Sequence, residues 1–185
     1  MDRRIQFPDP DSHADWKEWA RALVEVCTRL IAPTPQDQYP VVSLSDAKSQ
    51  GVAGGTFTAG AWQIRDLNTE TDPAKICLLS GNTFQLPQGR YFMRGRMPAY
   101  AVAQHQARLW NITLNAAALI GTSEYAGAAG NSASHSWVRG IVEIKAVTTF
   151  RLEHRCLATK TGDGLGVPMN VGTEVYSQLE IWGLA

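Results

Sequence analysis

The stretch from Phe84 to Thr113, FQLPQGRYFMRGRMPAYAVAQHQARLWNIT, limits this chain most strongly to a β fold. Pro87-Gln88-Gly89 predicts a turn, because proline presets one backbone dihedral and glycine accepts conformations that other residues avoid. After this turn, and again in the strand predicted at Gln104–Leu114, the residues alternate with the period of a β-strand. The sequence therefore predicts two strands joined by a corner, with core faces formed by Tyr91, Met93 and Gly95 and by Ala107 and Leu109.

The faces of these strands that are expected to point away from the core carry aromatic rings and arginines. The same pattern returns in the strand predicted at Glu174–Trp182, where Val175, Leu179 and Ile181 are expected to face the core. An outer face of this kind predicts contact with something other than water, most simply with a second copy of the chain. We therefore expect a self-association interface formed by Phe92, Arg94, Arg108, Trp110, Tyr176 and Trp182.

Further short runs with period two are separated by turn signals rich in glycine, proline and asparagine. They include Trp62–Leu67, Val138–Ala146 and Thr148–Ala158. Several short strands at this spacing predict an all-β sandwich. In the last of these runs His154 is expected in the core, or alternatively on a threefold axis beside its symmetry mates.

An amphipathic helix is predicted near the start of the chain, from a cap at Ser12 to about Ile31. Its apolar positions have the spacing of a coiled-coil seam and comprise Trp16, Trp19, Leu23, Val26 and Leu30. Two interpretations stay open: the helix packs on its own β domain, or it forms a short bundle or a docking surface for another protein. Pro33 and Pro35 end it.

The expected organisation is an N-terminal arm and anchor helix at residues 1–32, a linker with prolines and glycines at 33–53, and the β domain at 54–185. Within the β domain, the alanine- and glycine-rich run Gly127–His135 predicts a loop. Loops on rigid β scaffolds often bind ligands, and a tolerated surface insertion is the alternative. The binding interpretation predicts receptor-facing residues at Asn131, Ser132, Ser134 and His135.

Composition excludes several classes of function. Seventeen basic and seventeen acidic residues cancel, which argues against nucleic acid as a partner, and no apolar window of membrane-spanning length occurs. The opening MDRRIQFPDPDS lacks the apolar core of a secretory signal, so we expect synthesis and assembly in a host cytoplasm. We expect no enzyme, metal or cofactor, because catalytic motifs and metal-ligand spacings are missing from the sequence.

The pattern F-x-x-P-x-G-x-Y at Phe84–Tyr91, followed by a strand with an apolar outer face, resembles the middle of the C1q/TNF-like jelly roll. Gly121–Tyr125 and the closing VYSQLEIWGL are similar to the version of this fold in phage virion proteins. The resemblance covers about Gly54 to Ala185. It implies a compact homotrimeric knob and no particular ligand.

The resemblance makes a structural part of a phage virion the expected function: a short tail fibre or head fibre, attached through residues 1–31 to another virion protein. The expected partner of the knob is a host surface glycan or protein, met by three copies of each loop. Two alternatives remain, a capsid-stabilising protein and a free soluble lectin-like module.

Overall fold

The computed structural model describes residues 13–31, 42–129 and 132–184, and the side chains of residues 13–15, 26 and 28–31 are outside the description. The chain divides into two units, Met1–Gln38 and Tyr39–Ala185. The first contains the helix α1 (His13–Ile31), which confirms the predicted helix. On α1 the rings of Trp16 and Trp19 contact each other edge to face, with centroids 5.6 Å apart.

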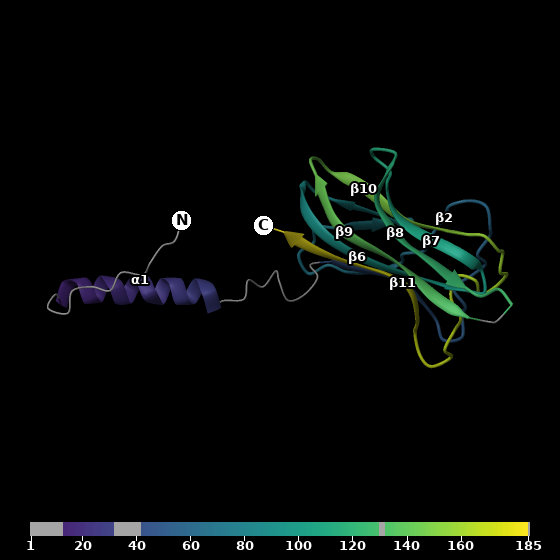
Figure 1. The fold of residues 1–185 in the computed structure, drawn as a ribbon, viewed down its shortest axis with the longest axis horizontal. Helices are drawn as coiled ribbons and strands as arrows, with labels where there is room; N and C mark the ends of the chain where they lie inside the picture. The colour runs from purple at the N-terminus through teal and green to yellow at the C-terminus, as the bar shows by residue number, and fades with distance from the viewer. Residues whose placement is uncertain (1–12, 32–41, 130–131, 185) are drawn as a thin grey trace. The chain divides into compact units, whose positions relative to one another are not determined.

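The second unit consists of strands and the loops between them (Figure 1). The described strands are β1 (Val42–Lys48), β2 (Gln63–Ile64), β3 (Thr69–Thr71), β4 (Leu78–Ser80), β5 (Thr83–Leu86), β6 (Gly89–Tyr100), β7 (Ala103–Asn111), β8 (Ala116–Ala126), β9 (Ala133–Ile144), β10 (Thr148–Cys156) and β11 (Glu174–Leu184).

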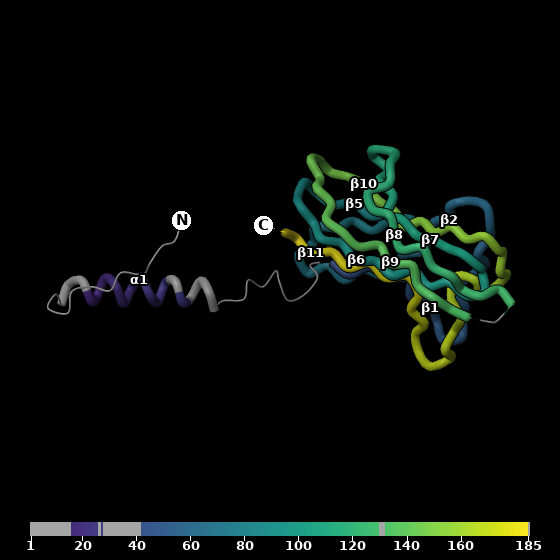
Figure 2. Tube along the Cα trace, viewed as in Figure 1, coloured from purple at the N-terminus to yellow at the C-terminus, as the bar shows by residue number. Residues whose placement is uncertain are grey.

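Two antiparallel sheets face each other in a jelly roll, which confirms the predicted fold class. Within the described residues one sheet has the strand order β3-β1-β11-β6-β9 and the other β4-β5-β10-β7-β8, with β2 added beside β10. From β5 onward the chain crosses between the sheets at each connection except the β7–β8 hairpin, while the first and last long strands, β1 and β11, pair side by side. This winding is the double Greek key of a jelly roll. The long connection from β10 to β11 can be followed in Figure 2.

The core between the sheets confirms the alternation predicted for β6 and β7. Tyr91 and Met93 are buried on β6, and Ala107 and Leu109 on β7. The corner between these strands uses positive φ angles at Ala101 and Ala103. Burial of the remaining core side chains, among them Phe84, Phe150, Leu152 and Leu179, supplies the main driving force for folding.

The predicted linker 33–53 is wrong in its second half, because Val42–Lys48 form β1 in the middle of a sheet. The segment VSLSDAK reads as polar, yet Val42, Leu44 and Asp46 alternate inward and are buried. Asp46 is accommodated by the Lys48 ammonium, whose Nζ lies 3.0 Å from its Oδ1. A buried carboxylate within the alternation conceals a strand from sequence reasoning.

A β-bulge between β1 and β11 overturns the predicted outward position of Tyr176. Ser45 pairs with Gln178 and Ala47 with Val175, so Asp46 alone faces two residues of β11. The extra residue shifts the inward alternation by one position. Tyr176 is consequently buried, with its hydroxyl donating to the Val52 carbonyl at 2.8 Å, and Val175 is exposed. Tyr176 is therefore not accessible to a second copy of the chain.

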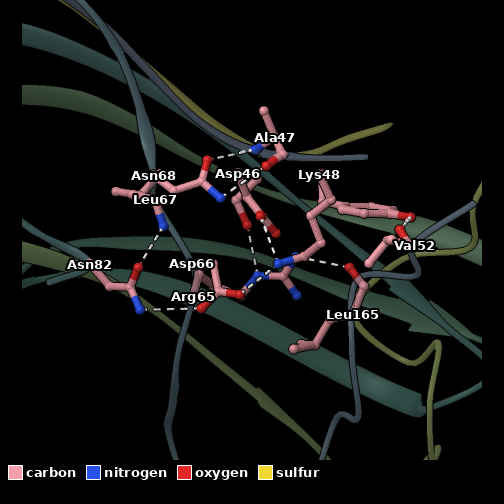
Figure 3. Close-up of polar contacts among 12 residues, drawn as sticks. Asp46, Ala47, Lys48, Val52, Arg65, Asp66, Leu67, Asn68, Asn82 and Leu165 are labelled. Carbon is pink, nitrogen blue, oxygen red and sulfur yellow. Dashed lines mark hydrogen bonds and ion pairs between the residues drawn. The ribbon is translucent and has the colours of Figure 1, made fainter. Parts of the chain in front are cut away.

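Arg65 is buried between the two sheets and contacts both. Figure 3 shows its side chain beside Asp46 and Leu165. Its backbone amide donates to Leu152 of β10, while its side chain donates to Ser177 Oγ of β11 at 2.7 Å. The guanidinium also donates to the carbonyl of Leu165 at 2.8 Å and of Pro98 at 3.3 Å. Burial lowers the pKa of Arg65 to about 10, so the group is still charged at neutral pH.

Two histidines lie in the same polar layer of the core. His154 is fully buried, as predicted for its face of β10, and its Nε2 lies 2.9 Å from Nδ1 of His105 on β7. Burial lowers the pKa of His105 to about 4 and that of His154 well below its usual value, and the Arg65 charge adds to both shifts. Both rings are therefore neutral in the folded protein near neutral pH.

The bulge predicts opposite effects for two neighbouring substitutions. Tyr176→Ala removes a buried ring and should lower the free energy of unfolding by about 3–5 kcal/mol, whereas Val175→Ala should change it by no more than about 0.5 kcal/mol. Urea unfolding curves of the two variants measure both values. Equal losses would contradict the bulge and restore regular alternation along β11.

The histidine pair predicts a loss of stability in acid. Between pH 6.5 and about 4 the unfolded chain protonates these rings while the folded chain does not protonate His105. The unfolded state then binds more protons, so each histidine lowers the free energy of unfolding by up to about 1.4 kcal/mol per pH unit as the pH falls. Thermal midpoints should therefore fall less steeply for His154→Gln than for the wild type across this range. Parallel pH profiles would contradict the proposed effect.

Candidate functional site: an aromatic sheet face

The outer surface of the β11-β6-β9 sheet gathers aromatic and charged side chains into three rows across the strands. Pairing aligns the residues of each row, because Phe92 lies opposite both Trp182 and Ile141, and Arg94 lies opposite both Glu180 and Arg139. We call this surface the aromatic face and define it by Trp182, Phe92, Ile141, Glu180, Arg94, Arg139, Gln178, Arg96 and Trp137.

The apolar row of the aromatic face is partly exposed in the single chain, because Phe92 and Trp182 are half-buried and Ile141 is exposed. Phe92 and Trp182 contact each other with ring centroids 5.4 Å apart. Ile141, at the end of the row, is 51% exposed, and Trp137 in the third row is 43% exposed. Exposed apolar side chains that adjoin in this way indicate an interaction surface rather than isolated surface residues.

The charged row is held by local contacts and retains an excess of positive charge. Arg94 donates to Glu180, with its Nη2 2.6 Å from Oε2, and its guanidinium lies 5.4 Å from the Trp182 ring. Arg139 lies 5.4 Å from the Phe92 ring and forms no ion pair with any described residue. Arg96 donates to Gln178, while its Nε is buried without an acceptor in the described chain. The face therefore offers the unused donors of Arg139 next to an apolar ring.

The loop around Met169, which lies between β10 and β11 and is called the Met169 loop below, extends the aromatic face toward the start of β11. Between this loop and Arg96 lies a cavity of about 420 Å³, and Met169 and Val171 of the loop are 77% and 74% exposed. The loop is held in place by Glu174, whose carboxylate accepts hydrogen bonds from the amides of Met169 and Asn170. These bonds lower the pKa of Glu174. The exposed apolar side chains of the loop are thus positioned by hydrogen bonds.

The predicted interface residues divide between the two sheets. Phe92, Arg94 and Trp182 meet on the aromatic face, whereas Arg108 and Trp110 project from β7 on the outer surface of the other sheet. There the Arg108 guanidinium lies 4.0 Å from the centroid of the Trp110 ring and bonds to Glu153 at 2.6 Å. One surface cannot contain both groups, because they lie on opposite outer sides of the sandwich. Trp137 and Ile141 were missed, although the alternation of β9 could have identified them.

The residues predicted to face a receptor are only partly in a loop. Asn131 lies outside the described residues, and Ser132 is exposed before β9. Ser134 and His135 belong to β9, where they pair with Ala99 and Pro98 of β6. Ser134 also points inward enough for its Oγ to lie 2.7 Å from His105 Nε2. The small residues of this segment extend a strand, because the β6 ladder supplies backbone partners to its end.

The described side chains show no group of three or more histidine, cysteine or acidic residues placed to hold a metal ion. Among the described helical residues, no segment is both long and apolar enough to cross a membrane. Cys156 is buried, Cys27 and Cys77 are half-buried, and these thiols are free.

Comparison with known proteins finds similarity in structure only. No protein-family model matches the sequence. No curated protein matches it either. The crystal structures of murine APRIL at pH 5.0 and at pH 8.0 are similar to 77% of this chain over 99% of theirs. Both show 7% sequence identity, with TM-scores of 0.45 and 0.44. Similarity at this level extends no further than the jelly-roll architecture already defined by the strand order.

Proposed function

We propose that the jelly roll is a homotrimeric, non-enzymatic knob whose copies meet through the aromatic face. The observation that carries this proposal is the partly exposed apolar row on a regular sheet, with Trp182 and Phe92 half-buried and Ile141 exposed. Burial between copies would remove these side chains from water. Arg139, which is exposed and forms no ion pair with a described residue, would gain an acceptor from a neighbouring copy, for which the planar guanidinium is well suited.

The number of copies follows from the resemblance to C1q/TNF-like knobs, which implies three. A closed ring of three copies uses two different patches of each chain. The Met169 loop adjoins the aromatic face across Arg96 and provides a second apolar patch beside the first. A closed ring also limits growth, so the exposed rings would not lead to open-ended aggregation.

The role that we propose for this knob is structural: a short fibre of a phage or phage-like particle, fixed through residues 1–31 and directed at a host surface. Support comes from the similarity of Gly121–Tyr125 and the closing VYSQLEIWGL to phage virion proteins. Trimerisation would multiply weak contacts with that surface through effective concentration.

Matched isoleucines on the two sheets test the interface. Ile141→Asp should raise the dissociation constant of the trimer at least about tenfold, because it would bury an unpaired carboxylate. Ile120→Asp, on β8 of the opposite sheet and 58% exposed, should leave association unchanged. Light scattering over a dilution series should give three times the 20.2 kDa chain mass for the wild type and for Ile120→Asp. A wild type that stays monomeric, or equal effects of the two variants, would contradict the interface.

Deletion of residues 1–31 tests the anchor. Both described core clusters consist of residues from Val42 onward, so the knob should keep its thermal midpoint within a few degrees. Incorporation into the particle should be lost together with the helix. Calorimetry and the particle-bound fraction of the two proteins measure these effects. A strongly destabilised knob, or normal decoration of particles by the truncated protein, would reject the anchor.

A further inference from the structure

The outer surface of the second sheet holds a groove on the side of the sandwich opposite the aromatic face. Its volume is about 570 Å³, within the range of about 300–1,000 Å³ typical of small-molecule sites. The floor is formed by β10, β7 and β8, whose register brings Arg155, Gln106 and Ser123 into one row. The next row places Gln104 opposite Tyr125. The floor of the groove is therefore built on strands.

Two aromatic rings border this groove. Tyr125 on β8 is 61% exposed, and its side chain forms no hydrogen bond, ion pair or ring contact with another described residue. Trp62 precedes β2 and is held by Arg108, whose guanidinium lies 4.0 Å from the ring centroid. Arg108 is itself fixed by its 2.6 Å bond to the buried carboxylate of Glu153. Trp62 is thus oriented before any ligand arrives, which reduces the entropic cost of binding.

Unused hydrogen-bonding groups lie beside these rings. The side chains of Gln104 and Arg155 have no ion pair or hydrogen bond within the described part of the chain. Gln106 donates through Nε2 to Gly121 and Ser123, which fixes its amide and leaves Oε1 free to accept. Glu124 adds a carboxylate to the lining of the groove. Its negative charge offsets the positive charge of Arg155, so the lining carries no net charge. Planar amide and guanidinium groups can each bond two neighbouring hydroxyls at once.

We infer that this groove binds a saccharide in the pyranose form. A pyranose ring presents C–H groups on one face, which pack on an aromatic ring, and hydroxyls around its edge, which need several donors and acceptors together. The neutral lining favours this ligand over a nucleotide or a phosphorylated peptide, which would call for an excess of cations. The inference rests on the proposed function, in which the knob meets a host surface. It places the contact with that surface on β10, β7 and β8 rather than on the loop predicted from the sequence.

Saturation-transfer difference NMR of the full-length protein tests this site, with glucose, galactose, N-acetylglucosamine and N-acetylneuraminic acid as probes. At least one sugar should receive saturation at its ring C–H protons. Tyr125→Ala should weaken that binding by about tenfold, and Arg155→Gln should weaken it as well. Ile120→Ala is the matched control, since Ile120 is exposed on the same strand but does not line the groove, and it should bind as the wild type does.

Two results would overturn the inference: no transfer to any of the four sugars at millimolar concentration, or unchanged transfer in both groove variants. Light scattering on the same samples separates this outcome from a failure of the proposed trimer. Tyr125→Ala should keep the mass of the wild type, whereas Ile141→Asp should dissociate and still give the saturation-transfer signal. Loss of the signal in Ile141→Asp with retention in Tyr125→Ala would instead place the sugar on the aromatic face.

Discussion

The arrangement of the two sheets depends on one buried cation. The backbone amide of Arg65 donates to β10 in one sheet, and its side chain donates to Ser177 and Pro98 in the other. These contacts lie at the end of the sandwich that has the smaller apolar core. The apolar core at this end consists of a smaller cluster around Phe57, Val102 and Leu165. A buried guanidinium is costly without acceptors, so each of these contacts restricts the distance between the sheets. The bond from the Arg65 guanidinium to the Leu165 carbonyl also ties the connection between β10 and β11 to this cation.

The polar contacts around Arg65 also explain why the core tolerates titratable groups. Asp46 and Lys48 lie next to Arg65 (Figure 3), and Asp46 is the residue that the bulge places opposite Tyr176 and Ser177. The bulge turns Tyr176 inward, where Gly166 leaves space: a side chain on Gly166 would overlap the Tyr176 ring. The polar contacts of Arg65, the bulge at Asp46 and the glycine at position 166 thus act together to shape this end of the sandwich.

Alternation along the sequence was sufficient to predict an all-β sandwich and the core faces of β6, β7 and β10, whereas the jelly roll was predicted from the resemblance to C1q/TNF-like proteins. Alternation failed where a polar residue is the buried one. Arg65 is buried while its neighbour Ile64 is exposed, the reverse of what hydrophobicity indicates. It also failed at Tyr176, because a bulge leaves no mark in a single sequence. Alternation indicates which face of a strand a residue occupies, but not the sheet to which that strand belongs. Trp110 and Phe92 were therefore assigned to one interface, although long-range pairing places them on opposite sides of the sandwich. The groove was missed for the same reason, since its rows join strands distant in sequence.

Two outer surfaces with different chemistry result from this fold. The aromatic face combines partly exposed apolar side chains with the unpaired donors of Arg139, which suits burial against another copy. The groove combines a held Trp62 ring and an exposed Tyr125 ring with the unbonded side chains of Gln104 and Arg155, which suits a small polyhydroxylated ligand. Because the surfaces lie on opposite sheets, a trimer formed through the first would leave the second open to solvent.

A crystal structure of the assembled full-length protein tests this division most directly. We expect three copies with Trp182, Phe92 and Ile141 buried at their contacts, and with Trp62 and Tyr125 open to solvent in each copy. An assembly that buries the Tyr125 groove and leaves the Trp182 row exposed would contradict this division of the two surfaces.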